Sequence, residues 1–329
     1  MDKLIDKNGC IDFGLFHQPV GLINYLDYAL KTPLGRSRSG LFKKMMFKQF
    51  SFVGLDAPEV MAGVAVVDLK YAANAFFYVF DKADRSFVET KKTTLPFTAD
   101  IAPEPDSGQA RFKAKNLDIT IDVDGLKAAG KNVELEAVLC RQAALPLRIC
   151  TRTGYTGWTY TQKTAPIPVS GKLSVNGRDY LFSTDSCMAI TDWTAGYFRR
   201  QTFWNWAAAA TVLPDGRHFG MNFSCGVNET EATENIFWID GKQVKVDNVK
   251  FQRHVGEGED RWHITSADGR VDLFFVPVSA RREHLNAWMV ASRFTQFLGY
   301  FNGRLGDATI GEVELEDCSG WAEDHFAKW

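Results

Sequence analysis

The richest concentration of chemically capable side chains lies between residues 192 and 206. This run holds three tryptophans, one tyrosine, two phenylalanines, two adjacent arginines and one aspartate. Aromatic side chains bury large areas and keep a polar edge, so they suit both cores and ligand cavities. Two arginines beside them are costly to bury unless an anionic or π-rich group receives them. We therefore expect most of any functional site in this run and in the segment that follows it.

Two carboxylates among these aromatics are the candidates for acid–base chemistry. Asp192 stands beside a tryptophan, and Glu234 precedes the apolar run 236–238. Desolvation among aromatics can make a carboxyl group a general acid or base. The structural alternatives stay open: Asp192 can cap a turn, and Glu234 can pair with Arg199 or Arg200 inside a barrel.

Other side chains of the region are candidates for proton donation or ligand binding. Tyr197 can donate a proton at a barrel mouth, or be a hydrogen-bonded core tyrosine. On a regular strand only one of Arg199 and Arg200 can face a cavity, because neighbouring side chains alternate. The predicted catalytic set is Asp192, Glu234 and Tyr197. The predicted ligand-binding set is Trp158, Trp193, Arg199, Arg200, Trp204, Asn205, Trp206, Asn222, Asn235 and Trp238.

Composition and motif searches argue against several classes of function. The net charge of -2 provides no basic field for nucleic acid. The six histidines form no HExxH or HxH pattern, and no GxGxxG or P-loop is present, so no metal and no cofactor is expected. The six cysteines lack zinc-like spacing and are expected to be reduced thiols.

The pattern of hydrophobic residues indicates neither a signal peptide nor a transmembrane segment. The first ten residues contain no apolar signal segment. The most apolar stretch, 62–80, is interrupted by Asp68, Lys70 and Asn74, so we expect no transmembrane segment. These features favour a cytoplasmic location, and the sequence does not indicate the oligomeric state.

From residue 47 onward the pattern predicts β structure. Apolar and polar residues alternate at 117–123, 133–139 and 312–316, as in half-buried strands. Residues 207–210 are predicted as strand despite four alanines, whereas 24–30 are predicted as a short helix and 31–44 as a basic solvated loop. Six turn dipeptides predict antiparallel hairpins: Asp124-Gly125, Asn176-Gly177, Asp215-Gly216, Asp240-Gly241, Asp268-Gly269 and Asn302-Gly303. Many short strands without alternating helices favour barrels or sandwiches.

Five motifs, four of which contain tryptophan, carry a family resemblance. These are residues 13–19, 157–163, 192–206, 233–238 and the tail 320–329. Together they resemble the uncharacterised bacterial domain-of-unknown-function family 2804, over nearly the whole chain. More distantly, the chain resembles calycin proteins with two lipocalin-like barrels, such as carotenoid hydratases, AttH-like proteins and lipocalin-like cyclases.

The resemblance implies an all-β, mainly antiparallel fold with two lipocalin-like β-barrels in tandem and few short helices. We expect an irregular segment at 1–44, a first barrel at 45–165 and a second barrel at 166–329 that carries the site. Some calycin relatives hydrate or cyclise hydrophobic substrates with acid assistance, but no catalytic set from them transfers to this chain residue by residue.

Three hypotheses of function follow. In the first, a barrel cavity lined by aromatics binds a hydrophobic or amphipathic small molecule. In the second, the protein is a lyase or isomerase that uses Asp192 or Glu234 as acid or base on such a molecule. In the third, both cores are filled and the role is structural. An open apolar cavity favours the first, and a polar pair facing it favours the second.

Overall fold

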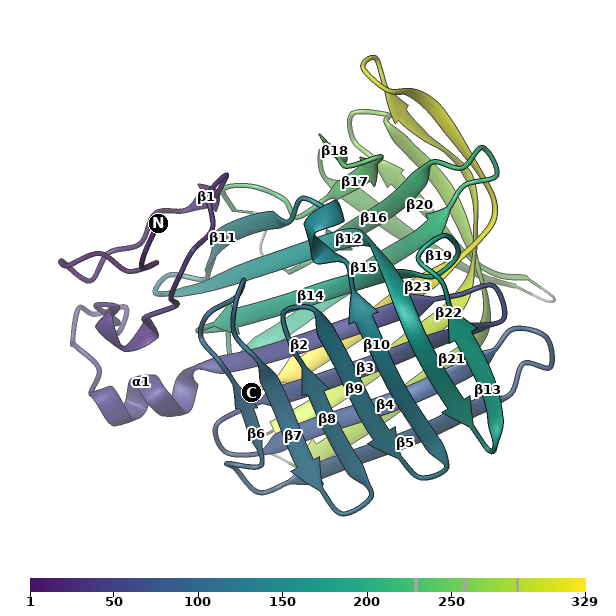
Figure 1. The fold of residues 1–329 in the computed structure, drawn as a ribbon. Helices are drawn as coiled ribbons and strands as arrows, with labels where there is room; N and C mark the ends of the chain where they lie inside the picture. The colour runs from purple at the N-terminus through teal and green to yellow at the C-terminus, as the bar shows by residue number, and fades with distance from the viewer. Residues whose placement is uncertain (228–229, 257–258, 288–289) are drawn as a thin grey trace. The chain divides into compact units, whose positions relative to one another are not determined.

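The chain folds into two compact units, Met1–Phe198 and Arg199–Trp329, which we call unit 1 and unit 2. The computed structural model describes residues 1–227, 230–256, 259–287 and 290–329 (Figure 1). Each unit is built on one strongly curled antiparallel sheet that forms a half-barrel. The predicted all-β antiparallel fold is thereby confirmed. The units divide between residues 198 and 199, whereas residues 165 and 166, the predicted division, lie inside strand β12.

Unit 1 contains fourteen strands among its described residues. Their order is β5-β4-β3-β2-β14-β12-β10-β9-β8-β7-β6, and β1, β11 and β13 lie off this path. The bounds are β1 (Gly14–Leu15), β2 (Lys48–Asp56), β3 (Val60–Asp68), β4 (Ala73–Asp81), β5 (Phe87–Thr94), β6 (Ala99–Ile101), β7 (Ala110–Ala114), β8 (Leu117–Ile121), β9 (Gly125–Gly130), β10 (Val133–Leu139), β11 (Leu147–Thr153), β12 (Gly157–Val175), β13 (Arg178–Phe182) and β14 (Met188–Gly196).

Strand β12 joins the two halves of this sheet. Its first half pairs with β11 and β14, and its second half pairs with β10 and β13. Its register with β14 shifts between Thr164 and Ile167, where Pro166 supplies no N–H to the ladder. The irregularity separates the two stretches of β12, so one strand can serve both halves of the curled sheet.

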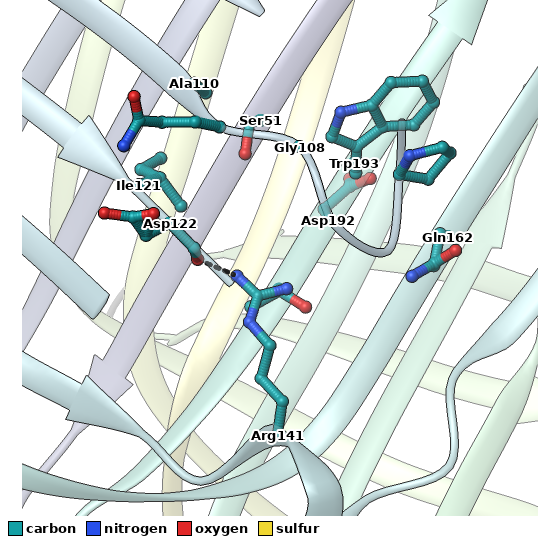
Figure 2. Close-up of a pocket in the computed structure, with 12 residues that line it drawn as sticks. Ser51, Gly108, Ala110, Ile121, Asp122, Arg141, Gln162, Asp192 and Trp193 are labelled. Carbon is teal, nitrogen blue, oxygen red and sulfur yellow. Dashed lines mark hydrogen bonds between the residues drawn. The ribbon is translucent and has the colours of Figure 1, made fainter. Parts of the chain in front are cut away.

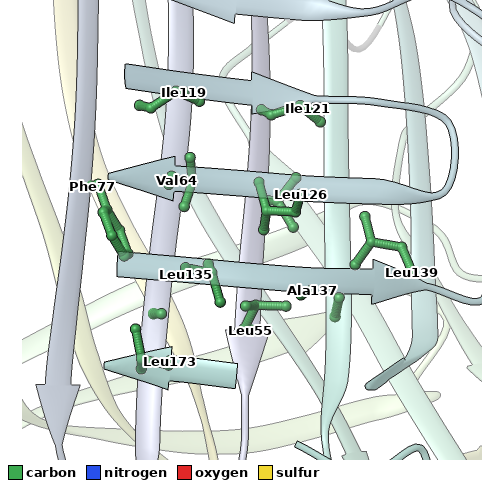
Figure 3. Close-up of a cluster of buried hydrophobic side chains, with 14 of the residues drawn as sticks. Leu55, Val64, Phe77, Ile119, Ile121, Leu126, Leu135, Ala137, Leu139 and Leu173 are labelled. Carbon is green, nitrogen blue, oxygen red and sulfur yellow. The ribbon is translucent and has the colours of Figure 1, made fainter. Parts of the chain in front are cut away.

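The main core of unit 1 fills the space between those halves. Strands β8 to β10 cross β2 to β4 at a steep angle, and Figure 3 shows Leu126 and Leu135 facing Val64 and Leu55. Along β10 buried and exposed residues alternate strictly, as the sequence predicted for 133–139. Burying such side chains contributes about 1.5 to 3 kcal/mol each, which makes this cluster a major source of stability for unit 1.

The N-terminal segment of unit 1 packs on one end of its sheet. It carries the 3₁₀ helix η1 (Tyr25–Asp27) inside the predicted helix 24–30. A second 3₁₀ turn, η2 (Arg141–Ala143), follows β10. The prediction of a solvated loop at 31–44 is wrong in part, because an α-helix, α1 (Gly40–Met46), begins there. The Ser39 side chain caps it by accepting a hydrogen bond from the Phe42 N–H, a signal missed in the sequence.

Unit 2 is a nine-stranded sheet in the order β18-β17-β16-β15-β23-β22-β21-β20-β19. Its apolar core includes Phe223, Phe237, Trp262 and Phe301. The bounds are β15 (Gln201–Val212), β16 (His218–Cys225), β17 (Ile236–Ile239), β18 (Lys242–Lys245), β19 (Val249–Gly256), β20 (Glu259–Ser266), β21 (Val271–Ala287), β22 (Val290–Asp307) and β23 (Gly311–Lys328). The predicted strand at 207–210 lies in β15 and is confirmed.

Five of the six predicted turn dipeptides join consecutive strands. Asn176 and Gly177, for example, have φ values of 49° and 86° and connect β12 to β13. The sixth prediction is wrong, because Asn302-Gly303 lies inside β22, where the pairing with β23 shifts register. Gly303 has a φ of 126° and serves that bulge, so a turn-type dipeptide here bends a long strand without ending it.

The helices of the described residues are all short. None of them is long and apolar enough to cross a membrane.

Candidate functional site

The predicted site residues fall into both units. Trp158, Asp192, Trp193 and Tyr197 belong to unit 1. The remaining nine, from Arg199 to Trp238, belong to unit 2. The structure therefore divides the predicted residues between two half-barrels, and each group is described within its own unit.

Trp158 and Tyr197 belong to an aromatic cluster of unit 1. Their rings meet edge to face at 5.6 Å, and Phe47 packs against both. The Tyr197 hydroxyl donates a hydrogen bond to the Tyr25 carbonyl at 2.9 Å, and burial raises the pKa of this tyrosine. The indole Nε1 of Trp158 is buried and has no hydrogen-bond partner in the part of the chain that the structure describes. This geometry matches the core interpretation of Tyr197.

Asp192 forms a buried ion pair with Lys163. The two residues stand opposite each other in the pairing of β12 with β14. The Thr194 hydroxyl also donates to Asp192, at 2.9 Å. Because side chains alternate along a strand, the carboxylate of Asp192 lies on the opposite face of the sheet from the neighbouring Trp193. Asp192 is therefore held by a fixed positive charge, and it does not cap a turn.

Trp193 points into unit 1, between its two apolar clusters. It packs against the main core and also against the cluster that contains Trp158 and Tyr160. Its ring meets Tyr160 edge to face at 6.1 Å. Trp193 therefore marks the layer at which the two clusters meet.

A small polar pocket opens at this layer, and Figure 2 shows the residues that line it. The pocket encloses a cavity of about 20 Å³, which is room for about one water molecule. Besides Trp193, its polar lining residues are Ser51, Gln109, Asp122, Arg141, Gln162, Thr191 and Asp192. Polar side chains of this number inside a β-barrel suggest a ligand or water site more than a packed core.

Arg141 enters the pocket from the turn after β10. Its Nη2 donates to the Asp122 carbonyl at 3.3 Å, drawn as a dashed line in Figure 2. Its Nε is buried without a hydrogen-bond partner among the described residues. Burial lowers the pKa of this guanidinium, and the carboxylates of Asp124, Asp106 and Asp122 oppose that shift. A cationic donor is thus held at the pocket with hydrogen-bonding capacity to spare.

A loop between β6 and β7 lines part of the pocket, and its Asp106 hydrogen-bonds Gln162 of the lining. Oδ1 of Asp106 accepts from Arg148 Nη2 at 2.6 Å and from Gln162 Nε2 at 3.0 Å. Gln162 in turn accepts from the Tyr160 hydroxyl at 3.4 Å, and burial raises the pKa of Tyr160. Pro105, Gly108 and Gln109 of the same loop line the pocket. We call residues 102–109 the cover segment.

Three predicted residues of unit 2 hydrogen-bond one another or the nearby backbone, and a fourth is buried beside them. Trp206 Nε1 donates to Asn222 Oδ1 at 2.8 Å, and Asn222 Nδ2 donates to the Glu234 carbonyl at 2.9 Å. Asn235 Oδ1 accepts from the Ser224 N–H at 2.7 Å. Trp238 is fully buried. These contacts tie β15, β16 and β17 together, and both asparagines hydrogen-bond groups of the fold itself.

Glu234 lies beside Lys245 in unit 2. The Lys245 Nζ donates to the carbonyls of Thr233 at 2.5 Å and Asn235 at 2.7 Å. Burial lowers the pKa of Lys245 to about 8, and the charge of Glu234 opposes that shift. The sequence-based alternative paired Glu234 with Arg199 or Arg200, and Lys245 is a further cation on which its charge acts.

Arg199 and Arg200 lie in the irregular link before β15, and both are exposed. Arg199 Nη2 donates to the Val227 carbonyl at 2.6 Å, and the Arg200 carbonyl accepts from the Trp329 N–H at 3.1 Å. Neither residue is in a strand, so the alternation argument that placed one of them in a cavity does not apply to them.

Trp204 and Asn205 contact Glu323 on the neighbouring strand β23. Trp204 Nε1 donates to Glu323 Oε2 at 3.3 Å, and Asn205 Nδ2 donates to the Glu323 carbonyl at 3.2 Å. Glu323 Oε1 also accepts from Gln296 Nε2 at 2.6 Å. The His325 ring meets the Trp204 ring at 4.1 Å. Trp204 and Asn205 were predicted, whereas their partners Glu323, Gln296 and His325 were not.

We expect the stability of the protein to fall as the pH is lowered from 7 to 5, because His325 is held neutral. Burial, aided by the charge of Arg281, lowers its pKa from 6.5 to about 3. The unfolded chain therefore binds a proton below pH 6.5 that the folded chain does not. The expected loss is up to about 2 kcal/mol at pH 5. Urea unfolding followed by circular dichroism measures it, and the pH dependence should shrink in His325→Phe but not in His254→Phe, at an exposed position of β19.

The described residues bring together no group of three or more His, Cys, Asp or Glu side chains suited to a metal ion.

With this geometry in view, comparison with known proteins gives the family. A family model described as a domain of unknown function, DUF2804, matches residues 1–329. The chain belongs to this family. No curated protein matches the sequence.

Solved structures resemble the fold of this family member. An AttH-like protein from Nitrosomonas europaea has a TM-score of 0.50 at 12% identity, over 94% of this chain and 99% of its own. CghA with Sch210972 has a TM-score of 0.52 at 10% identity, over 100% and 97%. Kievitone hydratase from Nectria haematococca has a TM-score of 0.49 at 10% identity, over 85% and 88%. At such identities the likeness concerns the fold alone.

Asp106, Arg141, Arg148 and Gln162 were not among the predicted site residues. Gln162 lies inside the motif 157–163, among threonines and a lysine, and its place in that motif is the one usable signal. The others gave none, because their partners lie far away along the chain: Arg148 meets Asp106 across 42 residues and Gln162 meets it across 56.

Proposed function

We propose that this member of the DUF2804 family binds a hydrophobic or amphipathic small molecule inside the half-barrel of unit 1. The polar end of the molecule lies at the pocket formed by Arg141, Gln162 and Trp193. The observation that carries the proposal is the buried Nε of Arg141, which lacks a hydrogen-bond partner among the described residues while the pocket lies between two apolar clusters. A buried donor of this kind is normally satisfied by a ligand or a water.

The size of the cavity sets a condition on this function. At about 20 Å³ it admits a water but not an organic molecule. A larger ligand therefore requires the cover segment to move away. The segment is attached by the two hydrogen bonds of Asp106 and by the Ile23 N–H, which donates to the Pro103 carbonyl at 2.8 Å. Because these contacts are few, a ligand that replaces them can displace the cover segment.

The fold supports the proposal in a general way. CghA, which shares the fold at 10% identity, was solved with Sch210972. That observation concerns CghA, and we use it only as support for small-molecule binding as one use of this architecture.

The test is native mass spectrometry of the protein from its own source, with extraction of any bound molecule and titration by tryptophan fluorescence. We expect Arg141→Gln to weaken binding of the extracted molecule roughly tenfold, the usual size of a lost charged hydrogen bond. Arg200→Gln, at an exposed position of unit 2, is the matched control and should bind as the parent does. Equal losses in both variants, or no molecule bound at all, would contradict the proposal.

A second candidate function is a lyase or isomerase reaction of the same molecule, in which Tyr160 donates a hydrogen bond. Burial keeps the Tyr160 hydroxyl protonated next to Gln162, where it can donate a hydrogen bond to charge that develops on a substrate. This is the lyase or isomerase hypothesis with Tyr160 in the place of Asp192, Glu234 or Tyr197. Incubation of the extracted molecule with parent protein and with Tyr160→Phe tests it: a change in the mass or isomeric form of the molecule should occur only with the parent.

A further inference from the structure

The cover segment places a carboxylate of the chain itself on the donors of the polar pocket. Oδ1 of Asp106 receives both hydrogen bonds, from Arg148 and from Gln162. The segment folds back on itself, because the Ala102 N–H donates to the Gln109 carbonyl at 2.9 Å and the Gly108 N–H donates to the Glu104 carbonyl at 2.7 Å. Asp106 therefore stands at the tip of a short closed loop that reaches into the half-barrel.

The ion pair between Asp106 and Arg148 has one hydrogen bond where its two groups could form two. A guanidinium and a carboxylate usually form two parallel hydrogen bonds, which use both oxygens. Here Arg148 Nε and Asp106 Oδ2 are both buried and neither has a hydrogen-bond partner among the described residues. Each unsatisfied buried group carries an energetic penalty. The backbone of the loop thus holds the Asp106 carboxylate where it forms only one hydrogen bond with Arg148. A carboxylate that is not attached to the loop could form both.

The pocket also offers more donors than Asp106 uses. Arg141 brings a second guanidinium with a buried, unpartnered Nε, and its one hydrogen bond goes to a backbone carbonyl. The carboxylate of Asp192 is turned to the other face of the sheet, where it pairs with Lys163. Arg141 and Gln162 line the pocket together with Asp122 and Asp192, and Arg148 adjoins it through its hydrogen bond to Asp106, whose charge also acts on Arg141.

We propose that this pocket is a carboxylate-binding site, in which Asp106 occupies the place of a ligand's carboxylate and leaves it with the cover segment when the ligand enters. The inference rests on the proposed function and narrows it: the ligand is an amphipathic carboxylate. Its carboxylate pairs with Arg148 and Gln162, and its apolar part lies along Trp193. Asp106 competes with the ligand, so it weakens binding and keeps the empty site closed.

Decanoate and decanol, which share a chain and differ in charge, are suitable probes. Isothermal titration calorimetry on the full chain gives the affinity of each at pH 7.5. Asp106→Asn keeps the shape of the loop and removes its charge, and should bind decanoate roughly tenfold more tightly with decanol unchanged. Asp106→Ala should show the same direction. Arg148→Gln should weaken decanoate roughly tenfold with decanol again unchanged.

Two exposed positions on neighbouring strands provide the matched controls. Asp100→Asn on β6 and Arg111→Gln on β7 remove the same charges without touching the pocket, so both should bind decanoate as the parent does. Binding of decanol and decanoate with equal affinity, unaltered in Asp106→Asn and Arg148→Gln, would overturn the carboxylate inference and leave small-molecule binding intact. If neither probe binds any variant, including Asp106→Ala, both proposals fail.

Discussion

Replacement of Asp192 by asparagine is expected to lower the free energy of unfolding by about 3 to 5 kcal/mol, the usual cost of removing one partner of a buried ion pair. The ion pair with Lys163 is shielded from water, with side-chain exposures of 7% for Lys163 and 12% for Asp192. The substitution removes the negative charge that Asp192 places against the buried lysine ammonium. Neighbouring strands hold both side chains in place, so neither can turn to solvent without disturbing the sheet.

Urea unfolding of the single variant and of the double variant Asp192→Asn with Lys163→Met measures this effect. The double variant removes both charges and should recover part of the loss. The surface pair Lys172–Asp179, with exposures of 52% and 51%, is the matched control. There Asp179→Asn should cost less than about 1 kcal/mol. An Asp192→Asn variant as stable as the surface variant would show that the pair contributes little.

This prediction changes how activity assays on Asp192 are interpreted. A loss of turnover in Asp192→Asn is the expected sign of a general acid or base, but a partly unfolded variant gives the same loss. The stability of the variant must therefore be measured to distinguish a catalytic role of Asp192 from a loss of folded protein. The position of the carboxylate, on the opposite face of the sheet from Trp193, favours the structural explanation.

Trp158→Ala is expected to destabilise unit 1 by about 3 to 5 kcal/mol, the range for truncating a large buried aromatic side chain. Its exposure is 0%, and its ring meets those of Tyr28 at 6.0 Å and Tyr197 at 5.6 Å, both edge to face. Truncation removes these contacts and leaves a cavity at the point where the N-terminal segment packs on the sheet. That segment should therefore loosen together with the loss of stability.

Thermal and urea unfolding give the size of this effect, and hydrogen exchange locates it. Faster exchange is expected in residues 1–30, with unit 2 unchanged. Phe203→Ala, at a position that is 63% exposed, is the control and should be nearly neutral. Trp158→Phe should lose less than Trp158→Ala, because most of the ring volume is kept. A Trp158→Ala variant with the stability of the control would mean that the cluster relaxes to fill the space.

The sequence was a good guide to local structure, because local structure depends on near neighbours. The alternation at 133–139 and the dipeptide Asn176-Gly177 predicted a strand and a hairpin that the structure contains. Asn302-Gly303 misled for a physical reason: a positive φ suits a bulge as well as a turn. The helix at Gly40–Met46 was missed because a basic, glycine-containing stretch resembles a solvated loop unless the Ser39 cap is noticed.

The candidate site was much less accessible to sequence reasoning. A dense run of aromatics identified Trp193 but could not show that its neighbour Asp192 faces the other way with Lys163, 29 residues earlier. The partners of the pocket come from strand pairings between distant segments, and one sequence carries no record of those pairings. The sequence shows directly which types of residue are present. Which of these residues contact one another depends on the register between paired strands.

The order of strands in unit 1 has a consequence for how the protein is made. Strand β2 pairs with β14, and Asp56 stands opposite Met188 in that ladder. The ladder therefore cannot form until residue 188 has been synthesised. During synthesis β2 to β5 are complete long before β14 leaves the ribosome, and the free edge of β2 exposes unpaired backbone groups throughout that interval. Open edges of this kind recruit other chains. Nascent chains that end before residue 188 are therefore the species of this protein most prone to aggregation, and the ones for which a chaperone would matter most.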